Sequence, residues 1–416
     1  MLIFTISKYI SILGGNVYAF GIGLYILNIT GSAINFAISM VCSLIPRIIF
    51  GPLAGAWADY FSKKKIIVIT QLVQSFSLFG VLFYAINFEF SLIVIYVTSV
   101  VLSICSTLSS VTFSSSITSL VNEEQIQKAT SLNQSAISFA AIGAPVIGGL
   151  LYGLSSIENF LLINASTYLI SGLLDMNLRF KHINEFSDSH QESKDKLLNR
   201  LKEAFLYLRQ NDFLYSTILP IAIWVNFFGV SIQVGLPYIV VEKLQLSPFQ
   251  FGIIEGSLAV GMLLMSLVLS TTKQITKPLV VMKASLLTLS VILLALILPL
   301  SIELTSSITF IYYVALILFF GVAIVFLNTP LYTMMQQTIP DSYKGRVFGF
   351  VETLANIISP VAILFYGLLY NYVNSIWILI GSSIALLLVT LIKMSNTEVL
   401  DIFKFQSTTE TEREIP

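Results

Sequence analysis

The stretch from Ser43 to Lys65 reads SLIPRIIFGPLAGAWADYFSKKK. One arginine, Arg47, interrupts an apolar run that ends in Asp59 and three lysines. At ~1.5 Å per helical residue, Arg47 lies about 18 Å from Asp59, which is near the middle of a bilayer if this segment spans one. An arginine at that depth costs ~2.5–3.5 kcal/mol to insert. We therefore expect Arg47 to face an aqueous cavity or a partner.

The composition of the whole chain supports a membrane protein. Of its 416 residues, 56% are hydrophobic and 11% are charged, whereas soluble domains carry about 25% charged residues. The mean hydropathy is +0.87, so most of the chain is expected to face lipid. The two cysteines, Cys42 and Cys105, both lie in apolar runs and predict neither a disulfide framework nor a metal site.

Twelve apolar stretches are long enough to cross a membrane, which takes about 20 helical residues. They predict an all-α membrane protein with twelve transmembrane helices, because open strands cannot satisfy their backbone in lipid. The expected spans cover residues 8–28, 34–58, 66–86, 91–115, 130–152, 160–178, 213–240, 249–270, 279–299, 307–330, 346–369 and 375–394.

The positions of the basic residues predict the orientation of these spans. Of the 22 lysines and arginines, all except Arg47 and Lys243 fall on one side if the N-terminus is inside the cell. The positive-inside rule therefore predicts a multi-pass protein of the cell membrane, with both termini in the cytoplasm.

The longest polar segment lies in the middle and separates six spans from six. We predict an N-terminal bundle over 1–179, a cytoplasmic linker over 180–212, a C-terminal bundle over 213–394 and a cytoplasmic tail over 395–416. The linker has helical spacing from Asp195 to Gln210. It is either an amphipathic helix on the cytoplasmic face or a solvated connection with no further role.

The two halves also resemble each other. Lys128 precedes Pro145, and Lys344 precedes Pro360, by a similar distance, and each proline is followed by a Tyr-Gly pair. Internal repeats of this kind are typical of transporters that bind substrate between their halves near the midplane.

Two motifs resemble those of the major facilitator superfamily. GAWADYFSKKK resembles the family's loop signature between spans two and three: Gly55, Asp59, Lys64 and Lys65 match, while Tyr60 and Ser62 depart from it. GAPVIGG resembles the Gly-Pro-x-x-Gly-Gly element of the family's antiporters, with matches at Pro145, Gly148 and Gly149 and Ala144 in place of a glycine. The order of elements is most similar to the branch of macrolide-efflux proteins and siderophore exporters.

This resemblance implies two pseudo-symmetric six-helix bundles, antiport, and a gating role for the loop signature. Asp59 would sit beside the N-terminus of span eleven, near Gly345, as the latch of the outward-facing state. A carboxylate beside a helix N-terminus gains ~0.3–1 kcal/mol. Gly55 is expected to let helices approach closely. Lys63 to Lys65 could equally be topology anchors.

Few acids lie inside the spans. Glu255 and Glu352 are the candidate partners of Arg47: depth favours Glu255, and the helix neighbourhood in the family favours Glu352. Alternatively, Arg47 is structural and binds backbone carbonyls. The same two acids are the candidates for proton antiport, which needs a buried carboxylate. Asp175 is expected to be interfacial.

No enzyme is indicated. The chain has no phosphate-cradling G-x-x-x-x-G-K-[ST] loop, its histidines lie outside the spans, and no cluster suits a metal. We therefore predict no cofactor and no nucleic-acid partner, and an ion gradient as the energy source. A monomer is expected.

The substrate cavity is expected to be lined by polar and aromatic residues of spans one, four, seven and ten, each of which could alternatively serve packing. Span four is rich in serine and threonine from Ser103 to Ser119. The candidates on the other three spans are Asn16, Tyr18, Trp224, Asn226, Phe227, Gln233, Asn328 and Tyr332. A mostly neutral lining of this kind suits amphipathic or weakly cationic organic compounds.

Three functions are compatible with the sequence. The first is proton-coupled, alternating-access export of drug-like or macrolide-like compounds, as in multidrug resistance. The second is export of an endogenous metabolite such as a siderophore, with Arg47 meeting an anionic substrate. The third is a receptor or scaffold on the same fold that no longer transports.

Overall fold

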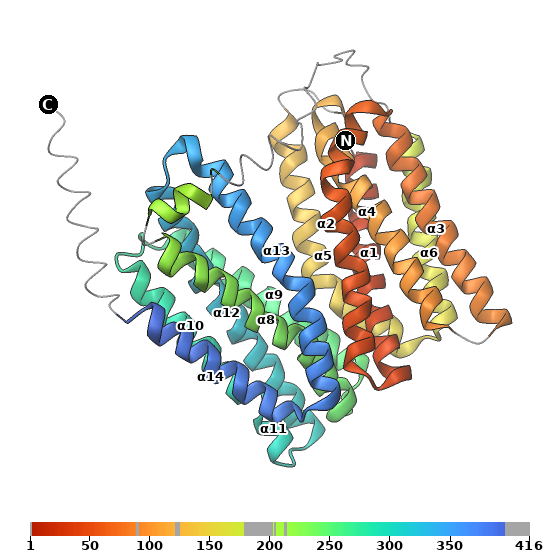
Figure 1. Ribbon diagram of the computed structural model, residues 1–416. Coiled ribbons are helices and arrows are strands. Elements are labelled where there is room, and N and C mark those ends of the chain that lie inside the picture. Colours follow the sequence, from red (N-terminus) through yellow and green to blue (C-terminus); the bar gives the residue numbers. More distant parts are fainter. Residues whose placement is uncertain are drawn as a thin grey trace, which may run out of the picture. The chain divides into compact units, whose positions relative to one another are not determined.

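The computed structural model describes residues 2–88, 91–120, 125–178, 203, 205–211 and 214–395 (Figure 1), and within these ranges every regular element is a helix. The first half contributes α1 (Leu2–Thr30), α2 (Ala33–Tyr60), α3 (Lys63–Asn87), α4 (Leu92–Leu120), α5 (Ile126–Leu154) and α6 (Ile157–Met176). The second half contributes η2 (Leu214–Ile218), α8 (Leu219–Pro237), η3 (Tyr238–Lys243), α9 (Pro248–Thr271), α10 (Pro278–Ala295), α11 (Leu298–Ser301), α12 (Ser306–Thr338), α13 (Asp341–Tyr372) and α14 (Ser375–Lys393).

Twelve helices of the described chain are long and apolar enough to cross a membrane, which confirms the predicted fold class. The segments η2 and η3 are wider π-helical stretches at the two ends of α8, so that Leu214–Lys243 forms one span. Such stretches are rare and often occur at functional sites.

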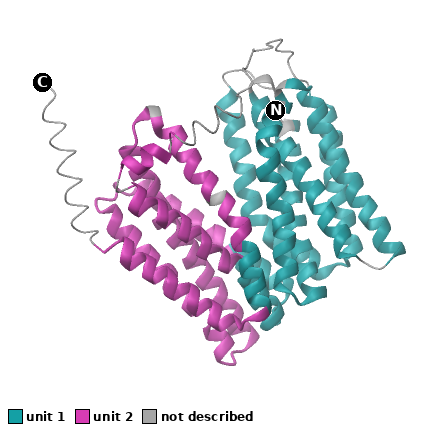
Figure 2. Cartoon of the chain, viewed as in Figure 1, with its two compact units in different colours: residues 1–188, 234–256, 363–371 teal, residues 189–233, 257–362, 372–416 magenta. Residues whose placement is uncertain are grey.

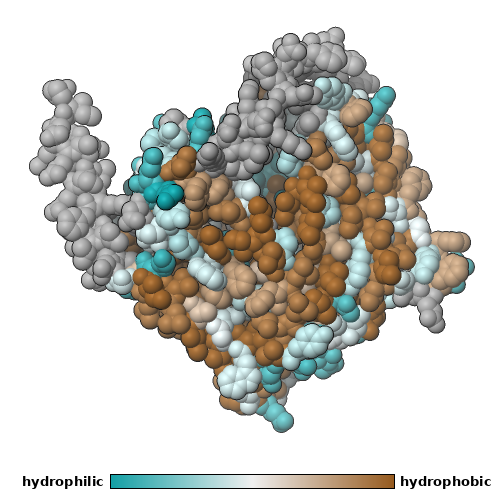
Figure 3. Space-filling model, in the orientation of Figure 1, coloured by the Kyte–Doolittle hydropathy of each residue, from teal (hydrophilic) through white to brown (hydrophobic). Residues whose placement is uncertain are grey.

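The polarity of the helix faces is the reverse of that in a soluble protein. On α3, the exposed side chains Ile69, Phe76 and Phe83 recur every seven residues, whereas Gln71 and Gln74 are buried. Residues seven apart share one helix face, so α3 turns an apolar stripe outward. Apolar residues likewise cover most of the surface drawn in Figure 3. This pattern is what a helix needs when its outer solvent is lipid.

The chain divides into two compact units (Figure 2). Unit 1 contains residues 1–188 together with two segments of the second half, 234–256 and 363–371. Unit 2 contains residues 189–233, 257–362 and 372–416. The bundle boundaries expected from the sequence follow chain order and stay a prediction.

Buried polar contacts join the helices of unit 1. The Ser75 hydroxyl of α3 donates to the carbonyl of Ala165 on α6 at 2.8 Å. The Gln74 amide donates to the carbonyl of Leu102 on α4 at 3.2 Å. Between membrane helices, hydrogen bonds and close packing replace the hydrophobic driving force. These bonds therefore fix how α3 sits against α4 and α6.

Buried hydrogen bonds and close packing also join the helices of unit 2. The Ser383 hydroxyl of α14 donates to the carbonyl of Ser290 on α10 at 2.8 Å, and the buried Tyr313 of α12 donates to the carbonyl of Leu296 at 2.9 Å. A methyl group added at Gly261 would lie 2.1 Å from the carbonyl oxygen of Leu318. Helices α9 and α12 therefore cross with their backbones in contact.

Candidate functional site

The clearest site in unit 1 is a contact between the two halves of the chain. We call "outer" the end of each span that the charge pattern predicts to face the outside. At this end, α5 of the first half crosses the start of α9 of the second half. A methyl group added at Gly149 would lie 2.5 Å from the Pro248 carbonyl oxygen, and one at Gly252 would lie 2.3 Å from the Pro145 carbonyl oxygen. Only glycine permits so close an approach of two backbones.

A second crossing at the outer end joins α2 to α13. A methyl group at Gly367 would lie 2.5 Å from the side chain of Ala37, and the Ser32 hydroxyl donates to the side-chain oxygen of Asn371 at 3.0 Å. We call the α5–α9 crossing at Gly149 and Gly252, together with this α2–α13 crossing, the outer seal. Each crossing joins the first half to the second, so the outer seal closes the ends of these four helices against each other.

Aromatic residues extend the outer seal. Phe20 of α1 stacks on Phe251 of α9, with ring centroids 5.5 Å apart. A methyl group at Gly148 would lie 3.2 Å from the carbonyl oxygen of Val17 on α1. The residues of the antiporter-like motif, Pro145, Gly148 and Gly149, therefore do lie at close helix contacts, while their part in antiport stays a prediction.

Below the outer seal, the same face of α5 becomes polar and exposed. Ser138 precedes Pro145 by seven residues and therefore shares its face. Gln134 and Ser131 continue this stripe at helical spacing, and all three side chains are exposed. This stripe was not among the residues predicted from the sequence. The available signal was the helical spacing of its members, which lie 7, 11 and 14 residues before the motif proline.

Arg47 is exposed on α2, and its face can be read from residue spacing. It stands 14 residues after Ala33 and seven before Ala54, both fully buried, so it shares their face. The exposed apolar stripe of α2, at Ile45 and Ile49, runs along a different face. Arg47 therefore does not lie on the face of α2 that is expected to contact lipid.

The two candidate acids differ in their surroundings. Glu255 is partly buried on α9, three residues after Gly252 of the outer seal, and forms no ion pair with Arg47 in unit 1. Glu352 is exposed on α13 in unit 2, and no described residue of that unit pairs with it. Which acid serves Arg47 during transport stays a prediction.

The gating motif is only partly as expected. No described atom lies within 4 Å of a methyl group built at Gly55, so no helix of unit 1 approaches this glycine closely, and its part in gating stays a prediction. Asp59 lies in the last turn of α2, but its side chain falls outside the described residues. Lys64 is partly exposed and Lys65 exposed. The neighbouring Lys63 donates to the carbonyl of Ser115 at 2.9 Å and so joins α3 to α4.

Most of the expected cavity residues are accessible, and one is not. Tyr18 is 4% exposed and belongs to the apolar core of unit 1, so in this structure it packs the core. Trp224 is exposed and stacks on Phe228, and Tyr332 is exposed and stacks on Phe348. The remaining members are exposed or partly exposed: Asn16, Asn226, Phe227, Gln233 and Asn328.

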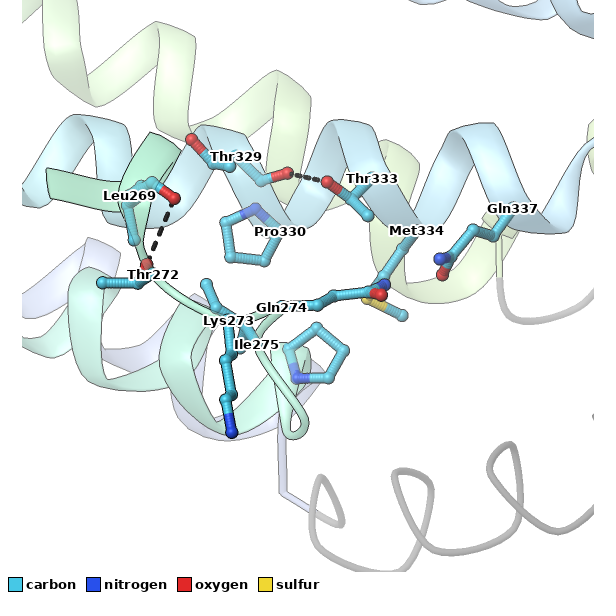
Figure 4. Close-up of a pocket in the computed structure, with 11 residues that line it drawn as sticks. Leu269, Thr272, Lys273, Gln274, Ile275, Thr329, Pro330, Thr333, Met334 and Gln337 are labelled. Atoms are coloured by element: carbon cyan, nitrogen blue, oxygen red, sulfur yellow. Dashed lines mark hydrogen bonds between the residues drawn. The ribbon is translucent and has the colours of Figure 1, made fainter. Parts of the chain in front are cut away.

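Unit 2 contains a small pocket between the α9–α10 connection and the inner end of α12 (Figure 4). Its volume is about 140 Å³, whereas drug-sized ligands occupy pockets of ~300–1,000 Å³. The Lys273 ammonium points away from the Pro330 ring. This pocket is therefore too small to hold an expected substrate. Its lining residues are Leu269, Thr272, Lys273, Gln274, Ile275, Pro278, Thr329, Pro330, Thr333, Met334 and Gln337.

The end of the central linker contacts the start of α13 within unit 2. Residues 205–210 are helical, in agreement with the amphipathic interpretation, while 195–202 lie outside the described residues. The Arg346 guanidinium donates to the Glu203 carboxylate at 2.7 Å, and Tyr207 stacks on Tyr343 with centroids 4.7 Å apart. The linker therefore binds the helix end that Asp59 was expected to latch.

Asp175 lies one residue before the end of the sixth span, as expected of an interfacial residue, but its exposed fraction is 0%. Helices α1 and α3 cover it because their small and polar side chains pack against α6.

Comparisons with known proteins agree with this architecture. The family model of the Major Facilitator Superfamily matches residues 4–363. Macrolide efflux protein A of Streptococcus pyogenes is 23% identical over 393 residues, which is 93% of each chain. The protein of the same name from Enterococcus faecalis is 25% identical over 80% of this chain and 100% of its own.

Solved structures show the same fold. The nucleoside transporter NupG matches with a TM-score of 0.68 at 14% identity, over 95% of this chain and 98% of its own. The xylose transporter XylE from E. coli matches in its inward open conformation with a TM-score of 0.64 at 13% identity, over 96% and 99%. The chain is therefore a membrane transporter and not an enzyme, and it belongs to the major facilitator superfamily.

Proposed function

We propose that this transporter exports small amphipathic organic compounds, drug-like or macrolide-like, by proton antiport. The observation that carries the proposal is the outer seal, because the residues that resemble the antiporter element form its backbone contact. Relatives named macrolide efflux protein A, aligned over nearly the whole chain, support this substrate class.

Alternating access would switch the protein between two sets of contacts. With the outer seal closed, the polar stripe of α5 would be reached from the inside, where it offers hydroxyl and amide groups to a substrate. Opening the seal would break the α5–α9 and α2–α13 crossings. Asp59 would then hold the inner ends by its contact with the start of α13.

Glu255 is our first candidate for the coupling proton. It lies one turn from Gly252, so opening the outer seal would expose its carboxylate to the outside. A carboxylate in an apolar site without a partner is best kept neutral by a bound proton. Proton binding there would compensate for the loss of the seal, and proton release to the inside would accompany its closure.

The proposal includes the setting of the protein. We place it in the cell membrane with both termini in the cytoplasm, because of the distribution of lysine and arginine, and we expect a monomer to transport. Outside labelling of Ser189→Cys in the linker tests the orientation, and efficient reaction with an impermeant reagent contradicts it.

Transport in everted vesicles tests the function. We expect uptake of a radiolabelled macrolide when the vesicle interior is acidified, and loss of that uptake when nigericin dissipates the pH gradient. Glu255→Gln should abolish gradient-driven uptake and keep downhill exchange, and Glu352→Gln serves as the matched comparison. Uptake that persists without the pH gradient overturns proton antiport, and absence of macrolide uptake overturns the substrate class.

A second candidate function is export of an endogenous anionic metabolite such as a siderophore. The exposed Arg47, on a face other than the apolar stripe of α2, favours it, since a guanidinium binds carboxylate groups with two parallel hydrogen bonds. Comparing metabolites in the medium of cells with and without the gene tests this alternative.

A further inference from the structure

Unit 1 buries two oppositely charged residues that the transport scheme above does not use. Lys8 of α1 is 4% exposed and Asp175 of α6 is 0% exposed. Lys8 lies three residues into the first span, Thr5–Thr30, and Asp175 lies one residue before the end of the sixth, Ile157–Met176. Both therefore lie near the inner ends of their spans, beneath the protein surface.

Serine contacts join α1 and α6 beside these two residues, whose charged groups are not within the 4 Å of an ion pair. The Ser7 and Ser171 hydroxyls lie 2.8 Å apart, and the Ser171 hydroxyl also donates to the Ser7 carbonyl at 3.3 Å. Ser7 adjoins Lys8, and Ser171 precedes Asp175 by one helical turn. The contact of α1 with α6 therefore brings the ammonium and the carboxylate to the same depth.

Helices α3 and α4 complete the enclosure. A methyl group at Gly172 would lie 3.3 Å from the Cβ atom of Gln71, so α3 packs closely one turn before Asp175. The Lys8 ammonium lies 4.6 Å from the centre of the Phe113 ring of α4. An aromatic face attracts a cation but is a poor substitute for water.

The carboxylate is not compensated by hydrogen bonds. Neither oxygen of Asp175 accepts a hydrogen bond of normal geometry from a described residue. The buried Gln71 Oε1 and Thr112 Oγ1 atoms also lack a hydrogen-bond partner among the described residues. The polar groups acting on Asp175 are Lys8 and the Ser7 hydroxyl. A buried ion pair offsets its desolvation cost only when its geometry and further hydrogen bonds are excellent.

No other described charge faces the pair. Asp175 is the charge that acts on Lys8, and Lys8 the one that acts on Asp175. Lys63 at the start of α3 is bound to the Ser115 carbonyl. Lys128 of α5 is exposed, and Glu158 lies at the opposite end of α6. The described helix α4 carries no Asp, Glu, Lys or Arg.

This arrangement can bind and release one proton, and it carries no net charge once that proton has been released. Transfer of one proton from the Lys8 ammonium to the Asp175 carboxylate gives a neutral amine and a neutral acid. Binding of one further proton, to the amine, gives the pair a charge of +1, and its release restores neutrality. No oxidant, reductant or other co-reactant is needed.

We propose that Lys8 and Asp175 form a proton-binding site at the inner end of the first six helices, where the proton that drives export leaves the protein. The inference rests on the proposed proton antiport and adds a second site to it. Glu255 takes the proton near the outer seal, and the Lys8–Asp175 pair delivers it inside. The alternative is that the two buried charges have a purely structural role.

Neutralising both partners separates the two roles. Lys8→Met or Asp175→Asn alone leaves one buried charge unpaired, and either variant should insert poorly. The double variant Lys8→Met/Asp175→Asn should restore the folded protein. In proteoliposomes we expect it to keep downhill exchange and to lose transport driven by a pH gradient about tenfold or more, the scale of one removed coupling contact. Glu158→Gln, which neutralises a partly exposed acid at the opposite end of the same helix, should behave as wild type.

The outcomes distinguish the hypotheses. A double variant that folds and keeps gradient-driven transport shows a structural pair and overturns this inference alone. If the wild type itself ignores the pH gradient, the proposed antiport fails, and this inference fails with it.

A measurement on the wild type covers the case in which the double variant does not fold. Dicyclohexylcarbodiimide reacts with protonated carboxyl groups in apolar sites, and mass spectrometry locates the modified peptide. We expect modification at Asp175 that decreases as the pH of the assay rises. Modification at Glu255 without any at Asp175 overturns the inference.

Discussion

The outer seal yields a prediction that follows directly from the backbone geometry. Gly252→Ala places a methyl group 2.3 Å from the Pro145 carbonyl oxygen and 3.3 Å from the Cα atom of Val146. Both atoms belong to the backbone of α5, so no side chain can rotate away. Ordinary contact begins near 3.4 Å, and α5 and α9 must separate by about 1 Å to restore it.

The size of the effect can be worked from this overlap. Overpacking a well-packed contact costs ~1–3 kcal/mol, and a difference of ~1–3 kcal/mol corresponds to a 5–150-fold change in an equilibrium. The ratio of closed to open outer seal should fall by that factor. Gly143→Ala on α5 is the matched control, because its nearest described atoms lie at 3.8–3.9 Å and belong to side chains. Both substitutions replace glycine by alanine within a helix, so the gain in helix stability, ~1 kcal/mol at most, is the same in both variants.

Cysteine labelling from outside intact cells measures the seal. A single reporter cysteine at Val146, in a background with Cys42 and Cys105 replaced by serine, should react slowly with an impermeant maleimide while the seal is closed. Gly252→Ala should raise the rate, whereas Gly143→Ala should leave it unchanged. An unchanged rate in Gly252→Ala with normal expression, or an equal rise in Gly143→Ala, would refute the reasoning.

Three further predictions concern the remaining charges. Asp59→Asn should impair transport and leave the amount of protein in the membrane unchanged, since it removes a charge–dipole contact worth ~0.3–1 kcal/mol and no core packing; normal transport would make Asp59 a topology residue only. Arg47→Ala should abolish transport or raise its pH optimum, because an acid that loses its cation titrates higher; normal transport with an unshifted pH profile rules out a role for Arg47 at the substrate or proton site. Arg346→Glu should weaken the linker contact by up to ~1 kcal/mol, as expected of an exposed pair, and Glu203→Arg should rescue it. Protease sensitivity of the linker measures this, and a double variant no better than the single one contradicts the pairing.

The twelve helices could be predicted from the sequence because the properties that define a span are local. A run of about 20 apolar residues crosses the bilayer, and helices satisfy their own backbone hydrogen bonds there. The family could be predicted for a similar reason, since the motif around Asp59 and the one around Pro145 are short and contiguous. Neither prediction requires information on how the helices pack against each other.

The faces of those helices were decided only by the tertiary structure. In a membrane, lipid is as apolar as the protein core, so hydrophobicity does not mark the side that packs. Tyr18 was therefore expected in a cavity and lies in the core. Asp175 was expected at the interface and is buried against α1 and α3.

The close contacts between helices likewise depend on which second helix packs against a glycine, and the local sequence around the glycine does not specify that helix. Gly55 and Gly149 stand in comparable motifs, yet no described atom approaches Gly55, while the Pro248 carbonyl closes on Gly149. A glycine permits two helix backbones to approach closely, but the contact forms only where a second helix packs at that position. The sequence by itself determined that the chain spans a membrane twelve times and to which family it belongs. The fold decided where the outer seal forms and which charges lie buried together, because both depend on contacts between residues about a hundred or more positions apart.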